Sequence, residues 1–390
     1  MTHWIDAAFV RGGTSKGLYF RADALPELDT APAPGTDGDT SAWDAIFCSA
    51  LGSPDAFGRQ LDGMGGGISS LSKVMVVSAS TRAGVDLDYT FGQVSVAEAV
   101  ADYSGNCGNL SSGVVPFALL TEIISAADGW HVFRLYNTNT GKLVDVGLTV
   151  VDGQAAVAGD FELTGVSGTG APIELIYPDP AGSRTSGILP TGVASESIDV
   201  DGRMFNVSMV DAALPVVIVP SSAISLNGDE SPESIDANRP SMLMIEELRR
   251  KAAVRMGLCE TPEAAPQVVP KVAVVTSQKP TTLLDGTSLA TTDSDVVIRM
   301  ISMGQTHKAV PGTGAMCLAA AAQIPGTIVH GIIARSEHSV PGPEVRLGTP
   351  SGVVTASAVW DEKAKTVTAT SLFRTARVLM VGKVAVEIRN

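Results

Sequence analysis

A cysteine in a glycine-rich segment is the first residue of this chain whose surroundings suggest chemistry. Residues 103–110 read YSGNCGNL and place Cys107 where a glycine turn leads into a predicted helix. Unpaired amide groups and the positive dipole end of a helix that begins there stabilise a thiolate. The thiol pKa then falls toward neutrality, where the group acts as an acid or a base. The alternative is a small buried side chain at a turn, and Pro116 predicts that the helix is short or kinked.

A second segment combines bare backbone, hydroxyl groups and a cation. Residues 63–73 read GMGGGISSLSK, so Gly66, Ser69 and Ser70 precede Lys73 at the start of a predicted strand. Backbone donors, serine hydroxyls and a lysine suit an anionic oxygen ligand. The nucleotide-binding pattern GxxxxGKS/T is absent. The alternative, which this segment alone favours, is a flexible loop with a solvated lysine.

The segment RGGTSKG at 11–17 offers the same combination directly after an apolar stretch. Arg11 suits bidentate binding of a carboxylate, with the hydroxyls of Thr14 and Ser15 beside it. The alternative is a hairpin that carries exposed charge. The segment is therefore either an anion-binding group or a hairpin without a binding role.

A histidine in the last quarter of the chain adds to the candidate anion sites. His307 precedes Pro311-Gly312-Thr313-Gly314, a glycine turn that opens a second predicted helix. Backbone amides at a helix start bind anions, and the histidine would complete such a site. The other histidines belong to no cluster of acids with ligand spacing, so we expect no metal. The remaining cysteines are expected to fill the core, and they are Cys48, Cys259 and Cys317.

Composition limits the classes of protein to which these residues can belong. The chain has 390 residues, enough for two domains or one large one, and its 40 glycines, 22 prolines and 5% aromatics exclude a coiled coil and a disordered chain. Its 27 basic and 41 acidic residues give a net charge of −14, which repels nucleic acid and acidic membranes. Four cysteines without a CxxC pair indicate neither a zinc ribbon nor a disulfide framework. These cysteines favour the reducing cytoplasm, and the N-terminus lacks a signal-peptide pattern, so we expect a soluble, cytoplasmic protein.

Period-2 apolar runs outnumber helical ones, so the chain reads as β-rich α+β and not as alternating βαβ. Helices are expected at Ser41–Leu51 and at Pro240–Met256. The apolar stretch Gly314–Ala334 is interrupted by a Pro-Gly step and reads as a buried helix followed by a buried strand, not as a membrane span. Strands are expected at Val74–Val77, Val85–Phe91, Trp130–Tyr136, Leu143–Val151, Ile173–Tyr177, Met204–Val210, Val216–Val219, Val272–Val275, Val296–Ile301, Val353–Val359 and Val367–Leu372.

Two stretches about half a chain apart resemble each other. KVMVVS at 73–78 matches KVAVVT at 271–276. Each is followed by a glycine turn that opens a small-residue helix, at 106–109 and at 311–314. The two offsets, 198 residues from Lys73 to Lys271 and 204 residues from Cys107 to Pro311, are nearly equal, which indicates a duplicated domain. Residues 178–192 have the composition of a linker near the middle of the chain.

Short motifs in order over essentially the whole chain together resemble the PrpF family. They are RGGTSKG at 11–17, DGMGGGISSLSK at 62–73, FGQVS at 91–95, DYSGNCGNLSSG at 102–113, GDFEL at 159–163, LPTG at 189–192, SMGQTHKA at 302–309, IPGT at 324–327, PSG at 350–352 and ARVLM at 376–380. That family includes 2-methylaconitate cis–trans isomerase, 4-oxalomesaconate tautomerase, 3-methylitaconate Δ-isomerase and aconitate Δ-isomerase. Each motif alone is weak, but their combination is specific for the family.

The resemblance implies the diaminopimelate-epimerase-like fold. In that fold two similar α+β domains each wrap a β-sheet or barrel around a central helix, and the active site lies in the cleft between them. We accordingly expect an N-terminal domain of residues 1–188, completed by a C-terminal strand within 373–390, and a C-terminal domain of residues 189–372. The resemblance also implies catalysis without a metal or an organic cofactor.

The resemblance further implies a proton shift across an allylic unit of an unsaturated di- or tricarboxylate. The lysine and cysteine of the family map onto Lys73 and Cys107, with Lys73 favoured as the base. A lysine is protonated near pH 7 unless burial or neighbouring cations lower its pKa, so the reverse assignment stays open. The residues expected around the substrate are Arg11, Thr14, Ser15, Gly66, Ser69, Ser70, Asn106, Gly108, Asn109, His307, Gly312, Thr313 and Gly314.

One position departs from the pattern of the related epimerases. They carry a second cysteine at the start of C-G-T-G, where this chain has Pro311, and Cys317 lies six residues further on. An epimerase or racemase of an amino or hydroxy acid is therefore the alternative activity, and a non-catalytic tricarboxylate-binding protein is the alternative of another class. The choice among similar acids depends on pocket shape, which one sequence does not show. We expect a small carboxylate as partner, and a homodimer is compatible with the low charge density.

Overall fold

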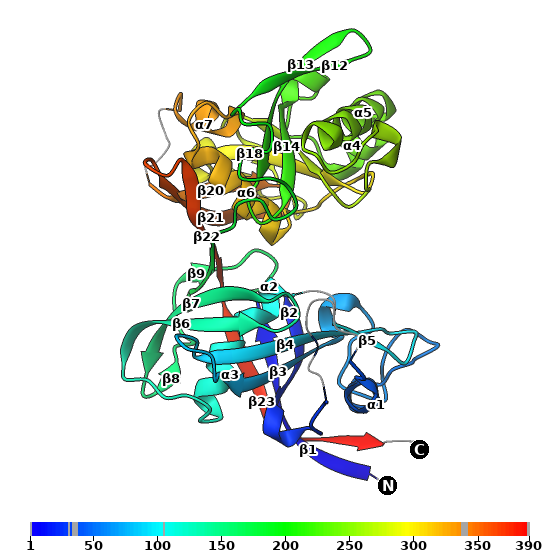
Figure 1. The fold of residues 1–390 in the computed structure, drawn as a ribbon, viewed down its shortest axis with the longest axis vertical. Helices are drawn as coiled ribbons and strands as arrows, with labels where there is room; N and C mark the ends of the chain where they lie inside the picture. Colours follow the sequence, from blue (N-terminus) through cyan, green and yellow to red (C-terminus); the bar gives the residue numbers. More distant parts are fainter. Residues whose placement is uncertain (1, 30–31, 33–37, 104–105, 337–341, 388–390) are drawn as a thin grey trace. The chain divides into compact units, whose positions relative to one another are not determined.

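The computed structural model describes residues 2–29, 32, 38–103, 106–336 and 342–387, which form two compact units (Figure 1). Unit 1 comprises residues 1–176 and 373–390, and unit 2 comprises residues 177–372. The domain boundary expected at 188 falls inside unit 2. Both units are built mainly of strands, with few helices, so the expected α+β class is confirmed.

The main sheet of unit 1 has the strand order β23-β1-β2-β3-β4-β6-β7-β11. Neighbours are antiparallel except in the pairs β2–β3 and β4–β6, which are parallel. The strands are β1 Thr2–Gly12, β2 Ser15–Arg21, β3 Lys73–Ala79, β4 Leu87–Val94, β6 Gly129–Asn137, β7 Lys142–Val151, β11 Ile173–Pro178 and β23 Ala376–Glu387. The short strands are β5 Ala101–Asp102, β8 Gln154–Ala155, β9 Phe161–Glu162 and β10 Thr169–Gly170.

The main sheet of unit 2 repeats this arrangement in the order β12-β13-β14-β15-β18-β20-β21-β22. Its parallel pairs, β14–β15 and β18–β20, occupy the same two places as those of unit 1. The strands are β12 Glu196–Val200, β13 Arg203–Asp211, β14 Pro215–Pro220, β15 Lys271–Thr276, β18 Val296–Ser302, β20 Glu344–Thr349, β21 Gly352–Asp361 and β22 Thr366–Arg374, with short strands β16 Thr281–Thr282, β17 Ser288–Leu289 and β19 Gln305–Thr306. The duplication expected from the sequence is therefore confirmed, and with it the two-domain architecture of the diaminopimelate-epimerase-like fold.

One helix covers an outer face of each sheet. In unit 1, α1 Ser41–Leu51 ends at Gly52, which has the left-handed φ of 78° that a glycine adopts without strain. In unit 2, α5 Arg239–Arg255 is capped by Asn238. The apolar stripe of the helix packs on alternate residues of β2 and β3 in unit 1 and of β14 and β15 in unit 2, such as Val217 and Val219 of β14. Both helices agree with the expectation from the sequence.

The opposite face of the unit 2 sheet surrounds α6 Gly312–Gln323. This helix is buried along nearly its whole length, and Figure 1 shows it on the other side of β14 from α5 and from α4 Pro232–Ala237. Cys317 lies in this core, and its thiol contacts the carbonyl of Val210 at 3.4 Å. Cys317 and Cys48 are buried, as expected, whereas Cys259 lies beyond the end of α5 and is half-buried.

The corresponding place in unit 1 holds two short helices, α2 Gly108–Ser111 and α3 Val114–Leu120. They are separated at Gly113, where a Cβ atom would come within 2.6 Å of the Tyr19 hydroxyl. Pro116 lies in the first turn of α3, where its missing N–H costs no helical hydrogen bond. The expectation of a short or kinked helix is confirmed.

One expected element is wrong. The second half of the stretch Gly314–Ala334 is not a strand but α7 Ile328–Ile333. Thr327 caps this helix by accepting a hydrogen bond from the amide of His330, and Val329 is buried against the core around α6. Among the described residues, no helix is long and apolar enough to cross a membrane.

Candidate active site

Lys73 is the first residue of β3 and is half-buried. It lies opposite Gln93, near the end of β4. Its ammonium group donates a hydrogen bond to Oε1 of Gln93 and lies 5.0 Å from the ring centroid of Phe91. Lys73 forms no ion pair with any residue that the structure describes. Its contacts are therefore with neutral groups, although the chain carries an excess of acids.

Gln93 also holds the end of the glycine loop. Its Nε2 donates to the carbonyl oxygens of Ser72 at 2.8 Å and of Ser69 at 3.2 Å. Gly66 earlier in this loop packs against Leu71, where a Cβ atom would come within 2.6 Å. Ser69 is exposed and Ser70 half-buried, at the start of a short 3-10 helix. Gln93 is a residue that sequence reasoning missed, since it appeared only within the motif FGQVS and without a role.

Cys107 is the N-cap of α2 and has an extended backbone, with φ −119° and ψ 96°. Its side chain is half-buried. Its carbonyl accepts hydrogen bonds from the amide of Ser111 at 2.9 Å and from the Ser111 hydroxyl at 3.0 Å. Asn106 is held by the hydroxyls of Ser111 and Tyr89. Residues 104 and 105 of the motif lie outside the described part of the chain. Because α2 has four residues, its dipole is that of a single turn.

Tyr19 anchors the turn that carries Cys107. Its hydroxyl, fully buried, donates to the carbonyl of Leu110. Burial, followed by the charge of a Cys107 thiolate and of Tyr89, raises the pKa of Tyr19 well above its ordinary value. Tyr19 therefore stays a neutral donor and fixes the first turn of α2.

The segment RGGTSKG forms the hairpin between β1 and β2, with Gly12 paired to Ser15. A hairpin is the structural alternative that the sequence left open, but its charged residues Arg11 and Lys16 are half-buried and not exposed. Asn109 rests on the hairpin, because its Nδ2 donates to Thr14 Oγ1 at 3.0 Å. A Cβ atom on Gly12 would come within 2.5 Å of the Asn109 carbonyl oxygen, so glycine is required for this close approach. Arg374 completes the arrangement by donating to Asn109 Oδ1 at 3.0 Å, a contact that the sequence did not predict.

Arg11 holds the same hairpin from its other side. One terminal nitrogen donates to the carbonyl of Gly13 at 3.0 Å and to the carbonyl and hydroxyl of Thr375 at 2.9 and 3.0 Å. Burial and the neighbouring charge of Arg377 lower the pKa of Arg11. Ser15 is buried beside it. The structure thus gives Arg11 a structural role, and its use as a carboxylate clamp remains a prediction.

Gly17 brings the lysine and cysteine elements together. A Cβ atom on this glycine would collide with the carbonyl of Lys73 and come within 3.1 Å of the Leu110 side chain. The start of β3 and the first turn of α2 therefore both pack against β2 at one glycine. Lys73 and Cys107 therefore lie on two elements of unit 1 that both contact Gly17.

The other predicted binding residues belong to unit 2. His307 follows β19 and is half-buried, and its backbone amide donates to the carbonyl of Met300 at 2.8 Å. Burial and the charge of Lys271 lower the pKa of His307. Gly312 begins α6, Thr313 is exposed and Gly314 is buried against Met300. In the described residues no three or more His, Cys, Asp or Glu side chains form a group that could hold a metal ion.

Comparison with known proteins extends over nearly the whole chain. The family model described as PrpF protein matches residues 2–387. The chain is 36% identical to the 2-methyl-aconitate isomerase of Shewanella oneidensis, over 98% of this chain and 96% of that protein. It is 37% identical to the 3-methylitaconate isomerase of Eubacterium barkeri, over 98% of this chain and 97% of that protein. It is 32% identical to the 4-oxalomesaconate tautomerase of Pseudomonas putida, over 98% of this chain and 96% of that protein. A crystal structure of methylitaconate-delta-isomerase is similar with a TM-score of 0.89 and 35% identity, and the match covers 99% of this chain and 96% of that one.

Proposed function

This chain belongs to the PrpF family and is an isomerase, and on that premise we propose that it moves a proton across the allylic unit of an unsaturated di- or tricarboxylate. Acids of the kind named for its relatives, such as 2-methylaconitate, 3-methylitaconate or 4-oxalomesaconate, are the substrates to test first. Four unpaired cysteines support the reducing cytoplasm as its location.

The observation that carries the proposal is the neutral surroundings of Lys73. The carboxamide of Gln93 and the ring of Phe91 position its ammonium group, and no described carboxylate pairs with it, so the group can face a substrate that carries carboxylates. Cys107 is half-buried on an element that shares Gly17 as a packing point with β3. One nitrogen and one sulfur group on adjoining elements supply the base and the acid that a proton shift needs.

We assign Lys73 as the base and Cys107 as the acid. The lysine takes a proton from the carbon allylic to the double bond, and the electron pair of the broken C–H bond enters a dienolate that extends to the carboxylate. Cys107 then gives a proton to the far end of the allylic unit, or to the original carbon after rotation about the former double bond. The two residues end with exchanged protonation states, and solvent restores them.

Formation of the dienolate places more negative charge on a carboxylate, so donors aimed at that group lower the barrier. In unit 1 we assign this task to Thr14, Ser15, Asn106, Gly108 and Asn109, with Arg11 and the loop residues Gly66, Ser69 and Ser70. Asn109 is the best supported of them, because Thr14 and Arg374 fix its carboxamide. In unit 2 the assigned residues are His307, Gly312, Thr313 and Gly314.

Deuterium exchange tests the assignment directly. Each candidate acid is incubated in D₂O with the wild type, with Lys73→Ala and with Cys107→Ala, and wash-in is followed by NMR. We expect the isomerisation rate to fall at least about 100-fold in both variants. Deuterium incorporation at the allylic carbon should be lost in Lys73→Ala. In Cys107→Ala it should continue although no product forms. The exposed Lys142→Ala serves as control. Full exchange and turnover in both variants would refute the assignment, and the opposite pattern would reverse the roles.

The alternative, an epimerase with two thiols, is disfavoured by the repeat. Pro311 is the N-cap of α6 in unit 2, as Cys107 is the N-cap of α2 in unit 1. The equivalent position therefore lacks an ionisable group, and buried Cys317 does not replace it. An assay with proline-type or diaminopimelate substrates distinguishes the two activities.

A further inference from the structure

Two buried tyrosines and a buried serine hold the turn that carries Cys107. Tyr19 on β2, Tyr89 on β4 and Ser111 at the end of α2 are each at most 1% exposed. The Tyr19 hydroxyl donates to the carbonyl of Leu110. The hydroxyl of Ser111 lies 3.2 Å from that of Tyr89. We call these three residues the hydroxyl cluster.

The repeat in unit 2 shows what the fold requires at these three positions. With Lys73 equivalent to Lys271 as the first residue of its strand, the registers of β2–β3 and β3–β4 match those of β14–β15 and β15–β18 and identify the equivalents of the two tyrosines. Ser111 is the fourth residue after the N-cap of α2, and its equivalent is the fourth after the N-cap of α6. The three equivalents are all apolar and lie in the core around α6; they are Ile218, Ile298 and Ala315. Apolar side chains therefore suffice for this architecture, and the hydroxyl groups are particular to unit 1.

The hydroxyl of Tyr19 lies at the break between α2 and α3. A Cβ atom on Gly113 would come within 2.6 Å of it, whereas unit 2 has Cys317 at the equivalent position, six residues after the N-cap of its helix. The Leu110 carbonyl accepts from the amide of Gly113, three residues further on, and from Tyr19. In unit 2 the helix α6 continues through the equivalent position without a break. The first turn in unit 1 is thus held by a side chain of β2.

The other contacts of the hydroxyl cluster hold the opposite end of the turn. The Ser111 hydroxyl lies 3.0 Å from the Cys107 carbonyl and 3.2 Å from Oδ1 of Asn106. The Tyr89 hydroxyl donates to the same oxygen of Asn106 at 3.3 Å. Cys107 therefore lies on a short turn that is fixed at its start by Ser111 and Tyr89 and at its end by Tyr19.

Stability alone does not require these hydroxyl groups. Burying a hydroxyl costs free energy, and the hydrogen bond that it forms largely offsets this cost, so an apolar residue of similar shape serves a core as well. Apolar residues occupy the three positions in the repeat whose N-cap is Pro311. Hydroxyl groups occupy them in the repeat whose N-cap is Cys107, which has an ionisable side chain. The difference between the repeats therefore coincides with the cysteine.

We propose that Tyr19, Tyr89 and Ser111 are positioning residues for Cys107, which fix the place of its thiol and take no part in the proton transfer. The assignment of Cys107 as the acid rests on the proposed function, whereas the fixing of its thiol does not. A displacement of a reacting group by about 1 Å can cost about 100-fold in rate. The hydroxyl cluster thus affects the reactivity of the thiol more than the stability of unit 1.

Removal of one hydroxyl group at a time, in Tyr19→Phe, Tyr89→Phe and Ser111→Ala, tests the proposal in the full chain. The first readout is the rate at which iodoacetamide alkylates Cys107 as a function of pH, followed by peptide mass spectrometry. Cys259, which is also half-buried, is the internal reference. We expect the pH midpoint for Cys107 to rise by about half a unit or more in each variant, because a loosened turn stabilises the thiolate less through its amide groups. The midpoint for Cys259 should stay unchanged.

The second readout compares catalysis with binding. With an unsaturated tricarboxylate we expect kcat to fall about 10- to 100-fold in each variant and KM to rise about 3-fold at most. The Kd of tricarballylate, a saturated tricarboxylate that has no double bond to isomerise, should also rise about 3-fold at most by calorimetry. Tyr136→Phe is the matched control, because the half-buried ring of Tyr136 on β6 lies against Arg82 and phenylalanine keeps that contact. This variant should match the wild type in both readouts.

The outcomes separate this proposal from the proposed function. A shifted midpoint in the variants, with no turnover of any unsaturated acid by the wild type, would remove the proposed function and leave the positioning of the thiol. Turnover by the wild type, with midpoint and kcat unchanged in all three folded variants, would overturn the positioning and leave the function. A lower kcat that recovers on cooling, with an unshifted midpoint, would show a structural role only and overturn the positioning as well. If Tyr19→Phe does not fold, as judged by circular dichroism, Tyr89→Phe and Ser111→Ala decide by the same criteria.

Discussion

Lys73 and Gln93 lie opposite each other on β3 and β4, and the carboxamide of Gln93 joins the ammonium group of Lys73 to the backbone of the glycine loop. Its oxygen faces the lysine and its nitrogen binds the carbonyls of Ser69 and Ser72. A neutral side chain thus fixes the position of the lysine without forming an ion pair with it.

Gln93→Glu tests the need for a neutral side chain at this position. A carboxylate at 93 would form an ion pair with the lysine and hold its proton, and it would repel the loop carbonyls that Gln93 now binds. We expect kcat to fall about 10- to 100-fold with the fold intact. Initial rates with an unsaturated tricarboxylate measure this effect. Gln154→Glu, at an exposed position of β8, should leave the rate unchanged, and a Gln93→Glu enzyme with wild-type kcat would show that the amide is not needed.

Gly17→Ala tests the packing point between β3 and α2. The new methyl group would collide with the carbonyl of Lys73 and press on Leu110. We expect a loss of about 1–3 kcal/mol in the free energy of unfolding, measured by denaturant titration, together with a lower kcat. The kcat should fall even at low temperature, where the variant is fully folded, because both catalytic elements are displaced.

The control for that substitution is Gly187→Ala. A Cβ atom at 187 meets nothing within 4 Å, and the backbone there does not have a positive φ. Stability and kcat should both match the wild type. Equal behaviour of the two alanine variants would show that the contact at Gly17 can relax without cost.

The sequence predicts best what is decided locally. α1 follows from its apolar spacing and from Gly52, and the repeated lysine at 73 and 271 follows from two similar strand starts. By contrast, the run Ile328-Val329 favours a strand, and α7 forms because Thr327 caps it and because Val329 docks into the core around α6. That choice depends on tertiary packing, which overrides local propensity.

The contacts that position the site depend on pairing between distant segments. Gln93 acquires its role from the register of β3 against β4. Arg374 reaches Asn109 from a strand 265 residues further along the chain. No local pattern marks either residue. The sequence therefore predicts Lys73 and Cys107 as the candidate base and acid, but it does not reveal the residues that orient the elements around them.

The four cysteines should differ in reactivity. Burial raises the pKa of Cys48 to about 11 and that of Cys317 to about 12, so at pH 8 their thiolate fractions are about one in a thousand or less. Cys107 and Cys259 are half-buried. Iodoacetamide should therefore label the latter two, as read by peptide mass spectrometry, and activity should be lost in step with Cys107.

Cys259→Ser separates the two labelled sites. This variant should be active and should be inactivated at the wild-type rate, since Cys259 is not assigned to the site. If the serine variant resisted inactivation, the loss of activity would belong to Cys259 and the assignment of Cys107 would fail. Protection of Cys107 by tricarballylate is the further expected result.

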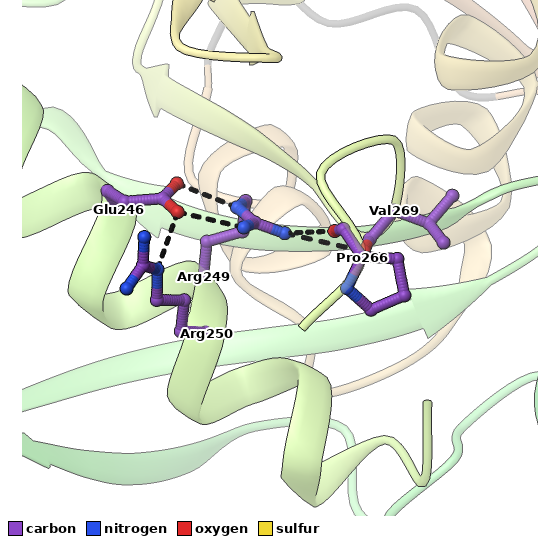
Figure 2. Close-up of polar contacts among 5 residues, drawn as sticks. All are labelled: Glu246, Arg249, Arg250, Pro266 and Val269. Carbon is purple, nitrogen blue, oxygen red and sulfur yellow. Dashed lines mark hydrogen bonds and ion pairs between the residues drawn. The ribbon is translucent and has the colours of Figure 1, made fainter. Parts of the chain in front are cut away.

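The network around Arg249 makes unit 2 sensitive to acid, and Glu246→Gln measures this. Both oxygens of Glu246 accept hydrogen bonds from the Arg249 guanidinium at 2.8 Å (Figure 2). Hydrogen bonds from Arg249, and then from Arg250, lower the pKa of Glu246 in the folded protein, and they outweigh burial, which raises it. Its contribution to stability is therefore present above the ordinary pKa of 4.5 and is lost as the pH falls through the lower folded value.

At pH 7 we expect Glu246→Gln to lower the free energy of unfolding by about 1–2 kcal/mol, less than for a fully buried pair because the Glu246 side chain is 32% exposed. Denaturant titrations at pH 7 and near pH 4 should show the difference from the wild type shrinking at the lower pH. Glu362→Gln, which removes an exposed pair with Lys365, should cost close to nothing at either pH. A difference that stayed constant with pH would mean that Glu246 acts through packing and not through its charge.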